Sequence, residues 1–140
     1  MTNPAIKSKP LPVPDADSKP FWEACAKHEL SLQRCGDCGA WRFPPSPLCP
    51  QCLSRAYAWQ PAAGRGSVYS FVIVREAMDP AWKDDLPYVV AIIALEEGPH
   101  MLSNVVGIPV EQVHVGMPVA VCFARASGDI VLPKFQPAAG

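Results

Sequence analysis

The chain of 140 residues is long enough for one ordinary domain or two small ones. Its 12 lysines and arginines against 13 aspartates and glutamates leave a net charge of −1, which argues against a protein that binds nucleic acids through their phosphates. The 49% hydrophobic content indicates a globular protein, and the 17 prolines predict short strands and loops instead of long helices.

No stretch is apolar over the roughly 20 residues that a membrane-crossing helix needs. The first residues also lead into no apolar signal core. We therefore expect a cytoplasmic protein without a membrane partner. In that reducing compartment the six cysteines are not expected to form disulfides and need another explanation.

The N-terminal region predicts an extended arm and then a short helix. Residues 1–17 contain four prolines and few large side chains, which is typical of an arm that is loose or lies on another surface. Ser18 is a candidate N-cap for a helix that we expect to end near Leu30. Phe21 and Trp22 lie on the apolar side of this helix.

After the helix, apolar and polar residues alternate as in a strand with one buried side. Leu30 and Leu32 are expected to face inward, and Ser31 and Gln33 outward. This strand leads directly to Cys35, the first residue of the most informative motif in the chain.

Two C-x2-C motifs predict a metal site. Cys35 and Cys38 form the first motif and Cys49 and Cys52 the second, with ten residues between them. Four thiolates can surround one d¹⁰ ion in a closed tetrahedral site that leaves no coordination position for catalysis. We therefore predict one structural Zn²⁺ ion; an iron centre that carries electrons is the alternative. Leu53 follows the second motif, where such turns often carry glycine.

From about residue 66 onward the pattern becomes a series of strands rich in β-branched and aromatic residues. We expect them at 67–75, 88–97, 100–106, 119–125 and 129–135, separated by turns that contain glycine. Five strands in so small a sheet cannot leave two bare edges, which favours a closed barrel. The segment 108–115 has room only for a turn of helix between the third and fourth strands, and this order matches an OB-type barrel.

Several strings of residues together resemble one family. They are PFWEA at 20–24, residues 30–35, CGAWRFPP at 38–45, CPQC at 49–52, GMPV at 116–119 and LPKF at 132–135. Over residues 18–137 the chain is similar to the zinc-ribbon/OB-fold proteins associated with thiolases, long grouped as a domain of unknown function. The resemblance implies a mainly β fold with a short N-terminal helix, a rubredoxin-like zinc ribbon and a five-stranded OB-fold barrel. With the arm, the expected division is 1–17, 18–62 and 63–140.

The resemblance also implies a role. Proteins similar to this one accompany thiolase-superfamily enzymes, some of them handle acyl-CoA, and one subgroup assists cleavage of steroid side-chain CoA thioesters. We therefore expect a non-catalytic accessory subunit in a hetero-oligomer with a thiolase-like enzyme, which carries out the carbon–carbon chemistry. The ribbon and the helix, through Phe21 and Trp22, would contact the enzyme, and the barrel would help to form or cover its acyl-CoA channel.

Cationic and aromatic side chains near the ribbon suit acyl-CoA. Its phosphates need cations, and its adenine needs a flat apolar surface. We predict acyl-CoA contacts for Arg34, Arg42 and Arg65, with Trp41 and Phe43 as aromatic surfaces. A solvated arginine face beside a core explains the same pattern equally well.

Two other functions stay open on the sequence alone. OB barrels and zinc ribbons can bind single-stranded nucleic acid, although the net charge is unfavourable and we expect no nucleic-acid partner. A rubredoxin-like iron electron carrier is the other. We predict no catalytic residue, because none of the common hydrolase or phosphate-binding motifs is present. The histidines are scattered, and Cys25 and Cys122 have the apolar neighbours of inert core thiols.

Overall fold

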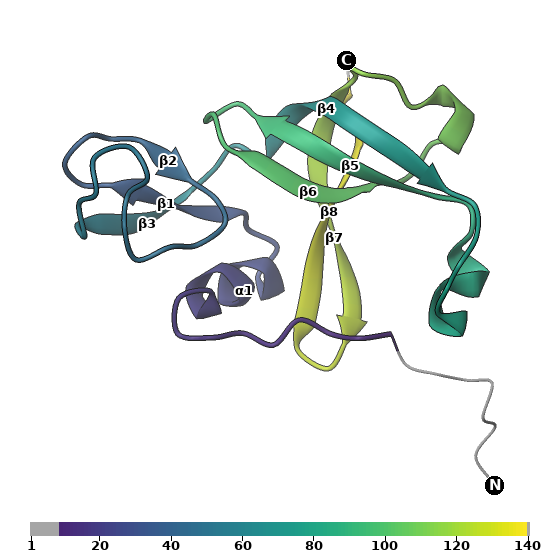
Figure 1. The fold of residues 1–140 in the computed structure, drawn as a ribbon, viewed down its shortest axis with the longest axis horizontal. Coiled ribbons are helices and arrows are strands. Elements are labelled where there is room, and N and C mark those ends of the chain that lie inside the picture. The colour runs from purple at the N-terminus through teal and green to yellow at the C-terminus, as the bar shows by residue number, and fades with distance from the viewer. Residues whose placement is uncertain (1–8, 140) are drawn as a thin grey trace, which may run out of the picture.

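The computed structural model describes residues 9–139, which form two parts (Figure 1). The first part consists of helix α1 (Lys19–Ala26) and the strands β1 (Ser31–Cys35), β2 (Trp41–Arg42) and β3 (Tyr57–Pro61). The second consists of the strands β4 (Arg65–Val74), β5 (Tyr88–Leu95), β6 (His100–Val105), β7 (Pro118–Ser127) and β8 (Ile130–Pro137), with 3-10 turns η1 (Pro80–Asp85) and η2 (Val110–Gln112). This mainly β architecture with a short N-terminal helix confirms the predicted fold class.

The five C-terminal strands close into a barrel in the order β4-β5-β6-β8-β7. Neighbouring strands are antiparallel except β6 and β8, which meet in one parallel pair, Val105 with Phe135. The ring closes where the first residues of β4 pair with the start of β7. The closed five-stranded barrel expected from the strand pattern is therefore confirmed, with η2 as the single turn of helix between its third and fourth strands.

Alternation along the strands builds the barrel core. In β5, Val89, Ala91, Ile93 and Leu95 are buried, and the residues between them point outward. Phe135 of β8 is fully buried in the same core. Because β5 is apolar at every position, its outward side is apolar as well.

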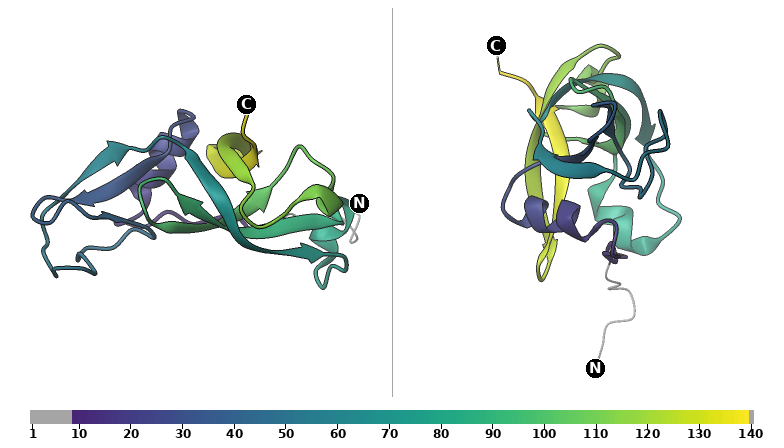
Figure 2. Two further views of the ribbon diagram at one scale, coloured as in Figure 1. Left: turned by 90° about the horizontal axis from the view of Figure 1, so that it is seen from above. Right: turned by 90° about the vertical axis from the view of Figure 1, so that its left-hand side faces the viewer.

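Helix α1 joins the ribbon to the barrel. It contacts β1 on one side and β8 on the other, and the end-on view in Figure 2 shows it beside the β7–β8 hairpin. Phe21 and Cys25 are buried in the same hydrophobic cluster as the barrel interior. The Phe21 ring centroid lies 5.1 Å from that of Trp22 and 5.3 Å from that of Phe43. No helix in the described part of the chain has the length and apolar character needed to cross a membrane.

The helix is shorter than the sequence predicts. It ends at Ala26 instead of near Leu30, because His28 adopts a left-handed φ of 61°. The Glu29 N–H then turns back to donate to the Ala24 carbonyl at 2.9 Å. This tight end reverses the chain within three residues and directs it into β1.

The start of the helix also differs from the prediction. Ser18 has helical backbone angles, and its side chain caps no N–H of α1. Instead its hydroxyl accepts from the Asp15 N–H at 3.0 Å, and the Asp15 carboxylate accepts from the Ser18 N–H at 2.8 Å. These two reciprocal hydrogen bonds lower the pKa of the Asp15 carboxyl. The capping interaction of the helix therefore lies about one turn before the predicted N-cap at Ser18.

The ribbon sheet has the order β2-β1-β3. Gln33 of β1 is fully buried, so the prediction that it faces outward is wrong. The loop after β2 folds over this side of β1, and the Gln33 side-chain oxygen accepts from Arg42 Nε at 3.2 Å and from the Ser46 N–H at 2.7 Å. Gln33 thereby holds the loop that leads to the second cysteine pair.

Residues 62–64 connect the ribbon to the barrel and are bonded along their whole length. The N–H of residue 62 donates to the Leu30 carbonyl at 2.8 Å, and the N–H of residue 63 donates to the Glu97 carboxylate at 2.8 Å. The Gly64 carbonyl accepts from the Val121 N–H at 2.7 Å. Gly64 has a φ of 74°, and a Cβ there would lie 2.5 Å from a Val121 side-chain carbon, so the position requires glycine.

Residues 9–17 run past α1 and the β7–β8 hairpin (Figure 1). The Lys9 ammonium pairs with Asp85 and lies 5.2 Å from the centroid of the Trp82 ring. This part of the arm is thus laid against the loop that contains η1. Residues 1–8, the rest of the predicted arm, lie outside the described residues.

Candidate functional site

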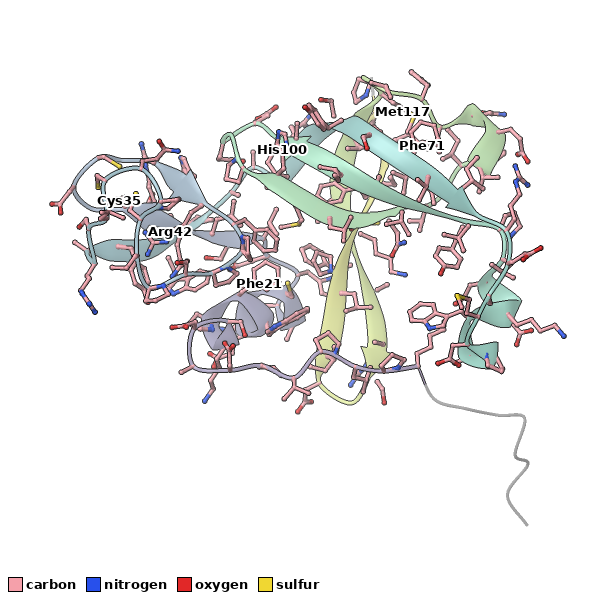
Figure 3. The ribbon with its side chains drawn as sticks, viewed as in Figure 1. Phe21, Cys35, Arg42, Phe71, His100 and Met117 are labelled. Atoms are coloured by element: carbon pink, nitrogen blue, oxygen red, sulfur yellow. The ribbon has the colours of Figure 1, made fainter. Side chains whose placement is uncertain are left out.

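The two C-x2-C motifs bring four thiols together in the ribbon, around the position of Cys35 in Figure 3. All four sulfur atoms lie within 4.8 Å of one another. Cys35 Sγ is 3.6 Å from Cys52 Sγ, and Cys38 Sγ is 3.6 Å from Cys49 Sγ. Zinc with tetrahedral Zn–S bonds of about 2.3 Å would separate its sulfurs by about 3.8 Å, so the observed cluster fits this ion.

Backbone amides favour the thiolate form at two of the four cysteines, Cys35 and Cys49, whereas burial and the neighbouring thiols raise the pKa of Cys38 and Cys52. The N–H groups of Asp37 and Cys38 each donate to Cys35 Sγ at 3.4 Å. These bonds, that of Cys38 first, lower the pKa of Cys35 to about 6. The Cys52 amide likewise lowers the pKa of Cys49. Four thiolates form a closed site for one zinc ion, whose chemistry there is structural.

Each cysteine pair is followed by a backbone turn of the same kind. The Gly39 N–H donates to the Cys35 carbonyl at 3.1 Å, and the Leu53 N–H donates to the Cys49 carbonyl at 2.8 Å. Gly39 has a φ of 75° and Leu53 a φ of 65°. A residue with a Cβ pays about 1–2 kcal/mol in this region, and Leu53 is 72% exposed, so packing does not offset the strain.

A cleft between the ribbon and the β5–β6 turn gathers most of the residues predicted to contact acyl-CoA. Trp41, Arg42 and Phe43 line this cavity of about 480 Å³. The Arg34 guanidinium lies 5.1 Å from the Trp41 ring centroid, and Arg34 Nε donates to the Gly39 carbonyl at 3.0 Å. Arg34 is exposed and does not line the cavity itself, so its remaining donors can reach a ligand there only from beside Trp41.

The other two predicted arginines have different surroundings. Arg42 is 4% exposed, stacks 4.7 Å from the Tyr57 ring centroid and donates to Gln33. Arg65 is exposed at the first residue of β4 and does not line the cleft. Glu97 at the β5–β6 turn, which no sequence motif singles out, does line it. Sequence patterns could not reveal Glu97, because only the packing of the barrel beside the ribbon brings it there.

The two residues predicted to bind a partner differ in how deeply their side chains are buried. Phe21 is 3% exposed inside the core. Trp22 is half-buried and lines a groove of about 310 Å³ with Leu102, Asn104 and Lys134. Of these two residues, only Trp22 is accessible for contact with another protein.

Residues 9–139 contain no cysteine or serine hydrogen-bonded to a histidine. His28 instead stacks 5.3 Å from Phe123, and His100 lies 4.5 Å from the Tyr69 ring. Cys25 is fully buried, and burial raises its pKa to about 12. A thiol with such a pKa is inert at neutral pH.

Two family models match adjacent parts of the chain. The rubredoxin-like zinc ribbon domain of ChsH2 matches residues 22–58, which include all four clustered cysteines. The C-terminal OB-fold domain of ChsH2 matches residues 59–124. The first match agrees with a zinc ribbon, and the second with the closed barrel.

Three relatives illustrate the sequence similarity. A probable enoyl-CoA hydratase alpha subunit from Thermomonospora curvata is 38% identical over 130 residues, which cover 93% of this chain and 40% of that protein. The 3-oxo-4,17-pregnadiene-20-carboxyl-CoA hydratase alpha subunit of Mycobacterium tuberculosis is 37% identical over 77% of this chain and 34% of that protein. A DUF35 domain-containing scaffold protein from Methanocaldococcus jannaschii is 35% identical over 69% of this chain and 68% of its own length. The chain thus spans less than half of each hydratase subunit.

Two solved structures share the fold. One, described as Ltp2-ChsH2(DUF35) aldolase, contains a chain that is 38% identical with a TM-score of 0.83, over 91% of this chain and 99% of that one. A DUF35-family protein from Sulfolobus solfataricus has a TM-score of 0.62 at 15% identity, over 88% of this chain and 86% of that one. The second likeness shows the fold alone.

Replacing Cys38 with serine is expected to remove zinc and unfold the ribbon. Structural zinc contributes about 10–16 kcal/mol of apparent binding free energy in finger peptides, and the ribbon has little core to replace it. Metal analysis and circular dichroism measure both effects. Cys122→Ser changes a half-buried thiol outside the cluster and should keep one zinc per chain. Iron as the bound metal, or full zinc retention by Cys38→Ser, would contradict the assignment.

Replacing Leu53 with glycine is expected to stabilise the ribbon by about 0.5–1 kcal/mol, because glycine relieves the left-handed strain at some cost in unfolded-state entropy. Leu53→Ala is the matched control, since alanine shortens the side chain and retains the Cβ. Urea unfolding of the zinc-loaded proteins gives the comparison. Equal stability of the two variants would show that the backbone at Leu53 is not strained.

Proposed function

The chain belongs to the DUF35 family of zinc-ribbon and OB-fold proteins, and from this premise we propose that it is a non-catalytic accessory subunit that binds a thiolase-superfamily enzyme. The observation that carries the proposal is the match to the chain of the Ltp2-ChsH2(DUF35) aldolase. Because 99% of that chain is covered, nearly all of it has a counterpart here. The absence of a nucleophile–histidine pair in residues 9–139 is consistent with chemistry that occurs on the partner.

The proposed partner is a thiolase or retro-aldolase that acts on a CoA thioester. Steroid side-chain CoA thioesters are the favoured substrate class, because the Mycobacterium tuberculosis relative is named for a pregnadiene carboxyl-CoA. In this proposal the partner makes or breaks the carbon–carbon bond, and the present chain helps to form or cover the acyl-CoA channel.

We propose that CoA is contacted at the cleft between the ribbon and the β5–β6 turn. Trp41 and Phe43 line the cleft and offer flat surfaces to the adenine, and Arg34, stacked on Trp41 beside the cleft, offers charge-assisted donors to a phosphate. Glu97 lies on the barrel side of the cleft and repels anions, so the phosphates would lie on the ribbon side, next to Arg34. Buried Arg42 is assigned a structural role in holding Gln33.

Co-expression with the thiolase-like enzyme subunit of the same organism should yield a soluble hetero-oligomer that co-elutes in size-exclusion chromatography. The enzyme alone should be less soluble or less active, because its channel would be incomplete. The chain carrying Cys38→Ser, with an unfolded ribbon, serves as the control and should not rescue the enzyme. Unchanged solubility and activity of the enzyme with and without the intact chain would overturn the accessory role.

Arg34→Gln in the hetero-oligomer should weaken CoA binding by about 10- to 100-fold, because a charge-assisted hydrogen bond contributes about 1.5–3 kcal/mol. Isothermal titration calorimetry with CoA gives the affinity. Arg55→Gln also removes an exposed ribbon arginine and should change the affinity less than about twofold. The same affinity for both variants, or no CoA binding by the intact hetero-oligomer, would remove CoA from this cleft.

A further inference from the structure

Apart from Arg65 at the first position of β4, one side of the barrel carries no charged residue along its strands. Figure 1 shows β4, β5 and β6 lying side by side on it, and the segments Ser67–Val74, Tyr88–Leu95 and His100–Val105 contain no Asp, Glu, Lys or Arg. We call their outward-pointing side chains the uncharged face. Its two central rows follow the strand register, Ser70 beside Ile92 beside Leu102, and Val72 beside Val90 beside Asn104.

The uncharged face is solvent-accessible as well as apolar. Val72 is 60% exposed and Leu102 is 69% exposed, and between them Val90 and Ile92 are half-buried. His100 lies at the ribbon end of β6 in Figure 3, and its ring packs against Tyr69, which is 58% exposed. The face therefore extends along the barrel as a continuous surface of apolar and neutral side chains.

Such a surface is unusual for a strand that faces water. Antiparallel sheets with one solvated side alternate apolar and polar residues, whereas continuous apolar runs such as β5 are typical of strands buried on both sides. Single exposed apolar side chains need no explanation, but contiguous ones mark interaction sites. Depletion of charge is the compositional signature of the centre of a protein–protein interface.

The strand pairing restricts how a partner can bind here. β5 is paired along both edges, with β4 and β6, so a peptide cannot add to it as a further strand. OB barrels that bind oligonucleotides use the surface around their second and third strands, which are β5 and β6 here. Nucleic-acid phosphates need cations, and the three segments that form the uncharged face contain no Lys or Arg. Binding must therefore occur by side-chain packing against another apolar protein surface.

We propose that the uncharged face is where the thiolase-like enzyme subunit docks, through an apolar and uncharged patch of its own. This inference rests on the proposed function and specifies its interface. An enzyme subunit is favoured over a second copy of this chain. The solved chain that is 38% identical, and of which this chain covers 99%, belongs to an aldolase assembly with a different protein, Ltp2.

The groove beside α1 extends the proposed interface. Leu102 and Asn104 belong to the uncharged face and also line the groove that contains Trp22. The interface can therefore continue from the barrel strands onto the helix without a charged interruption until Lys134 at the far rim of the groove. In this proposal Trp22 is the residue through which the helix contacts the enzyme subunit.

The test compares Leu102→Asp and Val72→Asp with Val115→Asp. Val115 is 64% exposed but lies between η2 and β7, outside the uncharged face. Calorimetric titration against the cognate thiolase-like subunit should show an affinity at least about 100-fold weaker for Leu102→Asp and Val72→Asp, and a change of less than about twofold for Val115→Asp. Zinc content and thermal unfolding should match the wild type, because all three side chains project into solvent.

A second measurement does not depend on how the variants fold. Hydroxyl-radical footprinting of the wild-type chain should show Tyr69 and Leu102 protected when the enzyme subunit is added, and Val115 unprotected. Wild-type binding with equal affinity for all three variants, or without this protection, overturns the interface and leaves the accessory role intact. Failure of the wild type to bind overturns the accessory role and, with it, this inference.

Two further outcomes would identify a different occupant and so overturn the proposal. A wild-type dimer in analytical ultracentrifugation that becomes monomeric in Leu102→Asp would assign the face to a second copy of this chain. Salt-dependent binding of single-stranded DNA that Leu102→Asp abolishes would assign it to nucleic acid.

Discussion

The four-cysteine site is the constraint on which the ribbon depends. Its three short strands have few buried apolar side chains, and polar Gln33 and Arg42 occupy part of its interior. Coordination of one zinc ion by four thiolates therefore replaces the missing core, so that metal uptake and folding of this segment are a single event. The turn that holds Cys35 also fixes Gly39, whose carbonyl positions Arg34 over Trp41.

The barrel is stabilised differently, by burial of apolar side chains, yet it is not independent of the segment before it. β6 and β8 share one backbone pair, so this side of the barrel is the least closed. Helix α1 packs beside β8 and places Phe21 in the same cluster as Met101 and Phe135. The helix thus protects the barrel core at its weakest seam while it supports the ribbon through β1.

The sequence was sufficient where the determining pattern is local. Two C-x2-C motifs specify their own ligand geometry, and alternating β-branched strands with glycine turns specify the barrel and its order. It failed where a distant segment decides the outcome. Gln33 is buried because a loop closes over a position that alternation leaves to solvent. Glu97 reaches the cleft because the barrel packs beside the ribbon. The early end of α1 depends on a left-handed His28, a conformation that residue type alone does not predict.

The short bonded connection at residues 62–64 determines what the molecule can present to another protein. A flexible connection would let the zinc ribbon and the barrel sample many relative orientations, and binding to a partner would then remove that freedom. Here every residue of the connection is anchored to a different segment, and Gly64 fits against Val121 with no room for a side chain. The angle between the ribbon and the barrel is set when the chain folds. A partner that contacts both parts therefore binds a preorganised shape, and little conformational entropy is lost on association.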